Sequence, residues 1–281
     1  MALTPKELVN YCNRITSLPA VYQRLDEAIN DPYSDLSNIA AILSEDSSLA
    51  ARLLRLANSA MFCFPSRVET VSRAVTIIGT KQLRDLVLAT SVIELFNKIP
   101  EEHVSMESFW RHSIATGISA RVIATYRREA NVERFYVLGL LHDIGRLVMY
   151  LQIPEMANRA IELSTESQLP LYQVEQQQLG FDHAAVGKAL LAKWKLPDSL
   201  QDGVAYHHKP ERATRYPEEA ATVHIADVIA NAFKMGSSGE PTVPPFVEQA
   251  WDRLGLTVDQ LPLITEQLEV QYSAAVDIFL N

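Results

Sequence analysis

Glycine, cysteine and long apolar runs are all scarce in this sequence. The 281 residues include 10 glycines and two cysteines, Cys12 and Cys63. Two cysteines are too few for a disulfide scaffold, and we expect both to be buried thiols in a reducing compartment. No stretch of 18 residues lacks a charged side chain, which excludes a membrane span. The first residues do not join a basic region to an apolar run, so we expect no secretory signal and a cytoplasmic location.

Basic charge is also in short supply. Residues 1–100 carry 10 basic and 10 acidic side chains, whereas the whole chain has a formal net charge of −9. The acidic excess therefore lies in residues 101–281. Proteins that bind long nucleic acid usually present a basic surface, so this composition argues against nucleic acid as a partner. The chain is 48% apolar and 21% charged, which allows a large core and excludes a disordered tail as the main content.

The spacing of apolar residues predicts an all-α fold. Apolar side chains recur at intervals of three and four, and no clear alternating run typical of strands is present. Thr4-Pro5-Lys6-Glu7 is a capping box that begins a helix, and Ser47 is the expected N-cap of a later one. Beyond the first, we expect helices at residues 18–29, 36–43, 48–58, 71–78, 81–96, 107–128, 133–151, 154–166, 171–179, 183–194, 199–208 and 218–233, with a last helix at 264–279.

The polar segment at residues 97–106 is the best candidate for a boundary between two helical modules. It contains Pro100 and separates two long stretches of helical periodicity. We therefore expect one module at residues 1–100 and a second at 101–234. Residues 235–245 have the composition of a loop, and a C-terminal helical extension follows it up to residue 281.

Histidines beside carboxylates on apolar helices are the main chemical signal. His142 and Asp143 lie within FYVLGLLHDIGRLVMYL, which is apolar on nearly every side. An ionised aspartate there is costly unless it is paired or binds a metal. A buried His–Asp pair satisfied by neighbouring helices is an equally simple explanation. Gly139 and Gly145 leave room for the close approach of a helix or a ligand.

Other residues on separate helices favour the metal. Each of these residues, taken singly, has a simpler explanation. His112 could be a surface or capping residue, and His207-His208 could be favoured by the negative end of their helix dipole. Asp227 could be a solvated or capped helix residue. His103, in the polar segment, fits a surface residue. Because several helices each supply a donor, we expect a site assembled by helix packing. Its expected ligands are His112, His142, Asp143, His183, His207, His208 and Asp227.

This donor set indicates the type of metal and the chemistry that it would support. Imidazoles and carboxylates suit one or two divalent ions among Fe, Mn, Zn, Co, Ni and Mg, rather than a thiolate-rich zinc site. Two ions about 3.5–4 Å apart would polarise a phosphoryl oxygen and activate a water. Arg146 lies one turn after His142, so we expect it to face the same cleft and bind a phosphate oxygen. Asp143 and Arg146 are thus the candidate catalytic residues.

The order His112, His142-Asp143, Asp227 resembles the HD superfamily of metal-dependent phosphohydrolases. The additional His183 and His207-His208 are similar to its binuclear branch, which includes the HD-GYP cyclic di-GMP phosphodiesterases. The segments SLPAVYQRLDEAINDP, ILSEDSSLAARLLRLANSAMF, FWRHSIATGISAR and LGLLHDIGRLVMY resemble the HDOD family of bacterial signalling proteins over residues 13–230. This resemblance implies an all-α fold whose second half is HD-like.

Two departures bear on catalysis. Tyr216-Pro217 follows Arg215, with no glycine to complete a Gly-Tyr-Pro element, and Arg146 stands where those enzymes usually carry lysine. The HDOD resemblance implies a regulatory module that binds signalling proteins or a small phosphorylated ligand, with its cleft closed by the 209–217 loop or the N-terminal half. The alternative is a phosphohydrolase of a nucleotide or cyclic nucleotide. A DNA-binding regulator built on residues 36–58 is disfavoured, because the leucines of its second helix fit a core.

Overall fold

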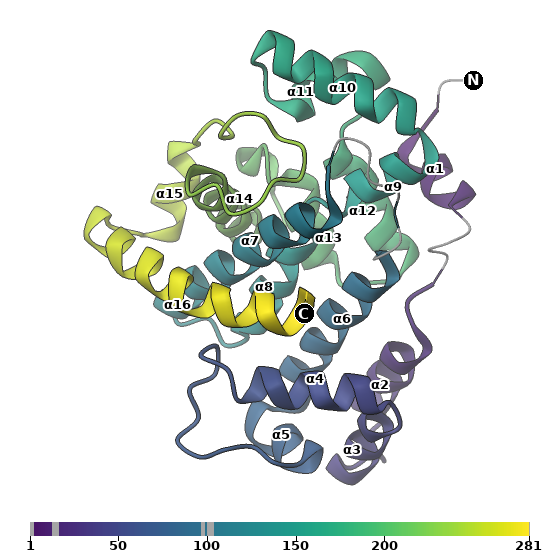
Figure 1. The fold of residues 1–281 in the computed structure, drawn as a ribbon, viewed down its shortest axis with the longest axis vertical. Coiled ribbons are helices and arrows are strands. Elements are labelled where there is room, and N and C mark those ends of the chain that lie inside the picture. The colour runs from purple at the N-terminus through teal and green to yellow at the C-terminus, as the bar shows by residue number, and fades with distance from the viewer. Residues whose placement is uncertain (1–2, 13–16, 97–98, 100–103, 281) are drawn as a thin grey trace.

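The computed structural model describes residues 3–12, 17–96, 99 and 104–280, and this part of the chain is helical with no strand (Figure 1). The predicted all-α fold is therefore confirmed. The first helix, α1 (Pro5–Tyr11), begins with the predicted capping box, in which Thr4 and Glu7 cap each other's backbone. None of the described helices is long and apolar enough to cross a membrane.

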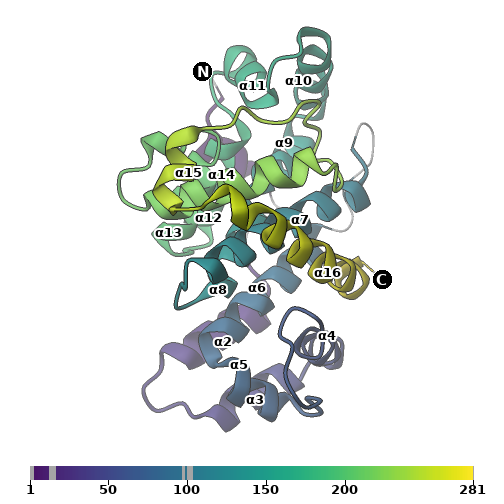
Figure 2. The same cartoon turned by 90° about the vertical axis from the view of Figure 1, so that its left-hand side faces the viewer.

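Four helices form one end of the molecule. They are α2 (Ala20–Asn30), α3 (Leu36–Ser44), α4 (Ser47–Ala57) and α5 (Val71–Ile78), and they lie together at the bottom of Figures 1 and 2. The α4 face that carries Leu49, Leu53 and Leu56 is buried. This burial confirms that the leucines of α4 belong to the core. The longer α6 (Thr80–Phe96) leads from this group and also packs against α8 (Val132–Leu141).

The rest of the chain surrounds α7 (Met106–Tyr126), which is buried along most of its length. Helices α8, α14 (Pro217–Ala232) and α16 (Leu261–Leu280) pack against it. Next to them lie α9 (Ile144–Gln152), α12 (His183–Lys193) and α13 (Asp198–Tyr206). The pair α10 (Pro154–Ser167) and α11 (Leu171–Leu179) lies at the opposite end from α2–α5 (Figure 2). The short α15 (Glu248–Leu254), not among the expected helices, lies in the predicted C-terminal extension.

Both ends of the chain cross between these groups. Helix α1 packs against α9 and α12, far from α2–α5, and α16 contacts α4 as well as α7. The boundary at residues 97–106 stays a prediction, because residues 97–98 and 100–103, with His103, lie outside the described part. The two groups nevertheless share helix contacts through α6 and α16.

The single helix predicted at residues 133–151 is wrong. The chain leaves helical geometry at Asp143 (φ −97°, ψ 8°), so α8 ends at Leu141 and α9 begins at Ile144. Adjacent residues of a continuous helix point about 100° apart, whereas the turn lets His142 and Asp143 face one point. The sequence did not reveal this break because apolar residues continue on both sides of it.

Two smaller expectations also fail. Asp46, rather than Ser47, caps α4, because its carboxylate accepts hydrogen bonds from the backbone of Ser48 and Leu49. Cys12 is buried as expected, but Cys63 is exposed in the loop between α4 and α5.

Candidate metal centre

The structure brings all seven predicted ligands together in the C-terminal group of helices. His112 comes from α7, His183 from the start of α12 and Asp227 from α14. The other four lie in turns that end α8 and α13. None of the seven is more than 8% exposed. The surface explanation for His112 and the solvated explanation for Asp227 are therefore wrong, since these residues are 0% and 3% exposed.

One cluster consists of His112, His142 and Asp227. The Nε2 atom of His112 lies 3.1 Å from Asp227 Oδ1 and 3.3 Å from His142 Nε2. The third side of this triangle, from His142 Nε2 to Asp227 Oδ1, is 3.5 Å. Three donor atoms at these separations can surround a single cation.

The second cluster consists of Asp143, His183, His207 and His208. His183 Nε2 lies 3.0 Å from Asp143 Oδ1 and 2.9 Å from His208 Nε2. His207 Nε2 lies 3.7 Å from the same Asp143 oxygen. One atom from each of the four residues therefore lies within the reach of one ion.

The Asp143 carboxylate joins the two clusters. Its Oδ1 faces His183 and His207, whereas its Oδ2 lies 3.3 Å from Nε2 of His142 and 3.9 Å from that of His112. A carboxylate with one oxygen in each cluster is suited to bridge two ions. The break between α8 and α9 places it there.

Hydrogen bonds orient three of the imidazoles toward the centre. The Nδ1 atoms of His142 and His207 donate to the carbonyls of Gly139 and Val204, and that of His183 donates to Glu175, at 2.6–2.7 Å. Because Nδ1 donates in each bond, Nε2 is the nitrogen that faces inward. Partners of this kind commonly fix the tautomer and direction of metal-binding histidines.

An unpartnered buried atom provides a test of whether the centre fits a metal. His207 Nε2 is buried and makes no hydrogen bond within the described part of the chain. Such a group is costly to bury without a partner. It points into the second cluster, beside the Asp143 carboxylate, where a divalent ion would satisfy it. The residues therefore fit a metal.

The ionisation of the histidines reflects the carboxylates around them. Burial lowers the pKa of His142, but Asp143 and Asp227 outweigh it and raise the pKa to about 10. His183 is subject to the same opposition, with Glu175 and Asp143 raising its pKa to about 9. Burial, with the charge of His142, lowers the pKa of His207 to about 3. A binding metal must therefore displace protons from His142 and His183.

Arg146 lies beside the centre but does not face open space. It is 2% exposed, and its guanidinium pairs with Asp143 and Glu240, both at 3.3 Å, and donates to the Ser238 carbonyl at 3.0 Å. Glu240 also accepts a hydrogen bond from the backbone of Leu171. The cover over Arg146 thus comes from the loop after α14, rather than from the 209–217 loop or the N-terminal half.

The sequence analysis missed three residues that support the centre. Glu175 orients His183, and Glu240 neutralises Arg146. His224 donates from Nδ1 to the carbonyl of His207 and accepts the Val247 amide at Nε2, so both its nitrogens are occupied. His224 therefore positions a ligand without being available as one. A histidine on an apolar helix was its only signal.

The centre comes closest to the surface at His208. This residue, at 8% exposed, stacks on Tyr172 with ring centroids 4.4 Å apart. Both line a cleft of about 470 Å³ that also contains Lys209 and Arg212. A small anion can approach the second cluster from this side.

An all-α protein with a buried centre of five histidines and two aspartates has the architecture expected of HD-like proteins. The HDOD domain model matches residues 15–210, so the chain belongs to the HDOD domain family. Asp227, Ser238 and Glu240 lie beyond this match, although they complete the centre or cover it.

The chain is also similar to solved structures and to one curated relative. An HDOD domain protein with unknown function from Geobacter sulfurreducens is 28% identical, with a TM-score of 0.77 over 94% of this chain and 93% of that one. A protein of Shewanella amazonensis, provisionally named a phosphohydrolase, is 26% identical, with a TM-score of 0.75 over 97% of both chains. An uncharacterised protein of Treponema pallidum (strain Nichols) is 29% identical over 230 residues, or 80% of this chain. The match spans 44% of that relative's length.

Proposed function

We propose that this chain is a cytoplasmic bacterial signal-transduction module whose metal centre has a regulatory role. The observation that carries the proposal is the environment of Arg146. Hydrolysis of a phosphoester needs an open metal position and a group that binds the phosphate beside it. Arg146 is the nearest such group, and Asp143, Glu240 and the Ser238 carbonyl already occupy it.

The arrangement of the seven donor side chains supports a metal site in this module. We assign His112, His142 and Asp227 to one ion and His183, His207 and His208 to a second, with Asp143 between them. The occupied Nδ1 atoms and the unpartnered His207 Nε2 support this assignment. The identity of the ion stays open among Fe, Mn, Zn, Co, Ni and Mg. The module would act on signalling proteins or respond to a small phosphorylated ligand, with no role for nucleic acid.

A metal-dependent phosphohydrolase of nucleotides or cyclic nucleotides is the second candidate. The complete donor set favours it, because such an ion, when bound, can activate a water and polarise a phosphoryl oxygen. The cleft at His208 offers a route for a phosphate past Lys209 and Arg212. In this case Asp143 would be a catalytic ligand, and Arg146 would have to leave Glu240 to bind phosphate.

Metal analysis and an assay of turnover together separate the two candidates. The protein is purified without chelator, its metal is measured, and hydrolysis of bis(p-nitrophenyl) phosphate and of cyclic dinucleotides is followed with Mn²⁺, Fe²⁺ or Mg²⁺. We expect bound metal and no hydrolysis above that of Asp143→Ala. Metal-dependent hydrolysis that disappears in Asp143→Ala would overturn the regulatory proposal. Equal activity in both proteins would indicate a contaminant and leave the proposal standing.

A further inference from the structure

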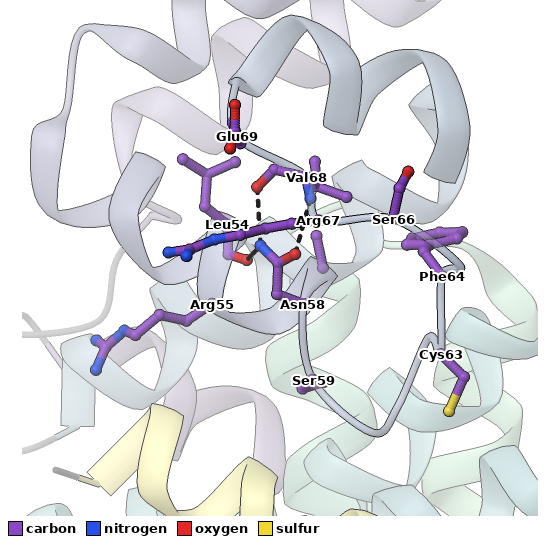
Figure 3. A pocket seen from close by; sticks show the side chains of 11 residues that line it. Leu54, Arg55, Asn58, Ser59, Cys63, Phe64, Ser66, Arg67, Val68 and Glu69 are labelled. Atoms are coloured by element: carbon purple, nitrogen blue, oxygen red, sulfur yellow. Dashed lines mark hydrogen bonds between the residues drawn. The ribbon is translucent and has the colours of Figure 1, made fainter.

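A second cavity lies at the other end of the molecule, away from the seven ligands. It is a cleft of about 730 Å³ formed by the end of α4 and the loop that leads to α5 (Figure 3). This volume falls within the range of about 300–1,000 Å³ typical of pockets for small ligands. We call it the arginine pocket. Its lining includes Leu54, Arg55, Ala57, Asn58, Ser59, Cys63, Phe64, Ser66, Arg67, Val68 and Glu69.

The Asn58 side chain joins the two ends of the loop that forms the pocket. The Asn58 amide donates to the carbonyls of Leu54 and Val68 at 2.7 and 2.8 Å, and its oxygen accepts the Val68 backbone amide at 2.8 Å (Figure 3). Asn58 thus ties residue 68 back to the last turn of α4. Val68 is 1% exposed, so Asn58 anchors the loop to a residue of the core. A pocket whose lining is already ordered loses less conformational entropy when a ligand binds.

The pocket carries positive charge that the protein does not neutralise. Residues 47–79 contain four arginines and one acidic residue, Glu69, in a chain of net charge −9. Arg52 pairs with Glu94, but within the described residues neither Arg55 nor Arg67 has a carboxylate partner. Figure 3 shows Arg67 extending across the pocket toward the side on which Arg55 lies. Two exposed guanidinium groups therefore flank one cavity.

The chemistry of the lining defines the ligand class. A phosphate monoester carries a charge of about −1.5 to −2 at neutral pH, which matches two guanidinium groups, and arginine suits phosphate geometry. Leu54 and Phe64, both half-buried, supply apolar lining, which can accommodate an apolar or aromatic group attached to the phosphate. Glu69, at the edge of the pocket, disfavours an extended polyanion. We propose that the arginine pocket binds a small phosphorylated ligand of the nucleoside monophosphate class.

Titration calorimetry of the full chain with AMP and GMP tests this proposal. It is run at low salt, with chelator present so that the metal centre does not contribute. We expect one of the two nucleotides to bind the wild type and to bind Arg55→Gln/Arg67→Gln at least tenfold more weakly. The control variant Lys6→Gln/Lys81→Gln removes the same charge from exposed positions outside the pocket and should retain wild-type affinity. All four substituted residues are exposed, and circular dichroism verifies that both variants are folded.

Four results would overturn the proposal. The first is no binding of either nucleotide to the wild type. The second is an equal loss of affinity in both double variants, which would indicate non-specific attraction. The third is binding that appears only when Mn²⁺ replaces the chelator and that the arginine substitutions do not weaken, which would assign it to the metal centre. Arginine-dependent binding of an oligonucleotide, without binding of AMP or GMP, would identify a nucleic-acid surface. The proposal does not depend on the function assigned to the metal centre, so either can fail alone.

Discussion

Asp143 is the residue on which both metal clusters depend. Its two oxygens face different clusters, whereas Asp227 contacts only the first. We therefore expect Asp143→Ala to lose most of the metal, and Asp227→Ala to fall from roughly two ions per chain to about one. Elemental analysis of protein purified without chelator measures both values.

The exposed Asp252 provides the matched control for this prediction, since Asp252→Ala removes a carboxylate that is not part of the donor set. It should bind as much metal as the wild type. Full metal content in Asp143→Ala would show that the carboxylate does not join the clusters.

The residues of the centre that could be predicted from the sequence are polar residues within apolar segments. His142 and Asp143 stand out because polar groups interrupt an apolar segment, and this conflict exists in the sequence itself. Glu175 does not stand out, because LYQVEQQQL is typical of a solvated helix. Its burial to 2% exposure arises only when α11 packs beside α12. Glu240 lies in a loop and gave no signal for the same reason.

At the scale of elements, the spacing of apolar residues located the helices but did not indicate which helices pack closely against each other. Gly139 and Gly145 indicated close contact with either a helix or a ligand, and the structure shows helices in both places. A Cβ on Gly139 would lie 2.7 Å from Gly117 Cα in α7, and one on Gly145 would overlap the His183 carbonyl in α12. These crossings bring the turn that ends α8 next to the candidate ligands of α7 and α12. The sequence shows where each glycine lies but not which helix packs against it.

Gly145→Ala should therefore be strongly destabilising. The new methyl meets backbone atoms of α12 that cannot rotate away, and we expect a loss of about 3 kcal/mol in the free energy of unfolding. Gly203→Ala is the comparison, because the nearest neighbours of its methyl are atoms of the flexible Leu138 side chain. Urea denaturation of both variants measures the difference. An equal or smaller loss at Gly145 would mean that α9 and α12 separate more easily than their packing indicates.

The loop at residues 235–247 should respond to pH through Glu240. Burial raises the pKa of Glu240 above its ordinary value of 4.5, although Arg146 opposes the rise. The closed loop thus holds a proton more tightly than an open one. Protonation therefore stabilises closure, and this stabilisation is lost as the pH rises through the raised pKa.

Hydrogen exchange checks this prediction with chelator present. After correction for intrinsic rates, amides near Glu240 should be better protected at pH 5 than at pH 7.5, and the pH dependence should shrink in Glu240→Gln. Better protection at pH 7.5 would show that the ion pair with Arg146 dominates the burial of the carboxylate.

At the scale of the whole molecule, the centre depends on parts of the chain beyond the family match. Residues 15–210 supply six of the ligands, but Asp227 comes from α14, and the cover over Arg146 comes from the following loop. Helix α16 then packs on α7, which carries His112. The C-terminal segment is therefore part of the same packed unit. A sequence comparison limited to the family match would omit one ligand of the first cluster.

Removal of the metal should weaken the C-terminal helices selectively. The ligands join α7, α12 and α14 to the turns that end α8 and α13, so an ion links elements that the open chain would separate. At a free metal concentration of 100 times Kd, binding adds about 2.7 kcal/mol of stability. For a chain of this size we expect chelation to lower Tm by roughly 5–10 °C. Hydrogen exchange should accelerate in α7, α12 and α14 but change little in α2–α5, which contribute no ligand. Adding the metal back should reverse the effect in the wild type and have no effect in Asp143→Ala. If hydrogen exchange in α2–α5 accelerates to the same extent, the metal instead stabilises the whole chain as one cooperative unit.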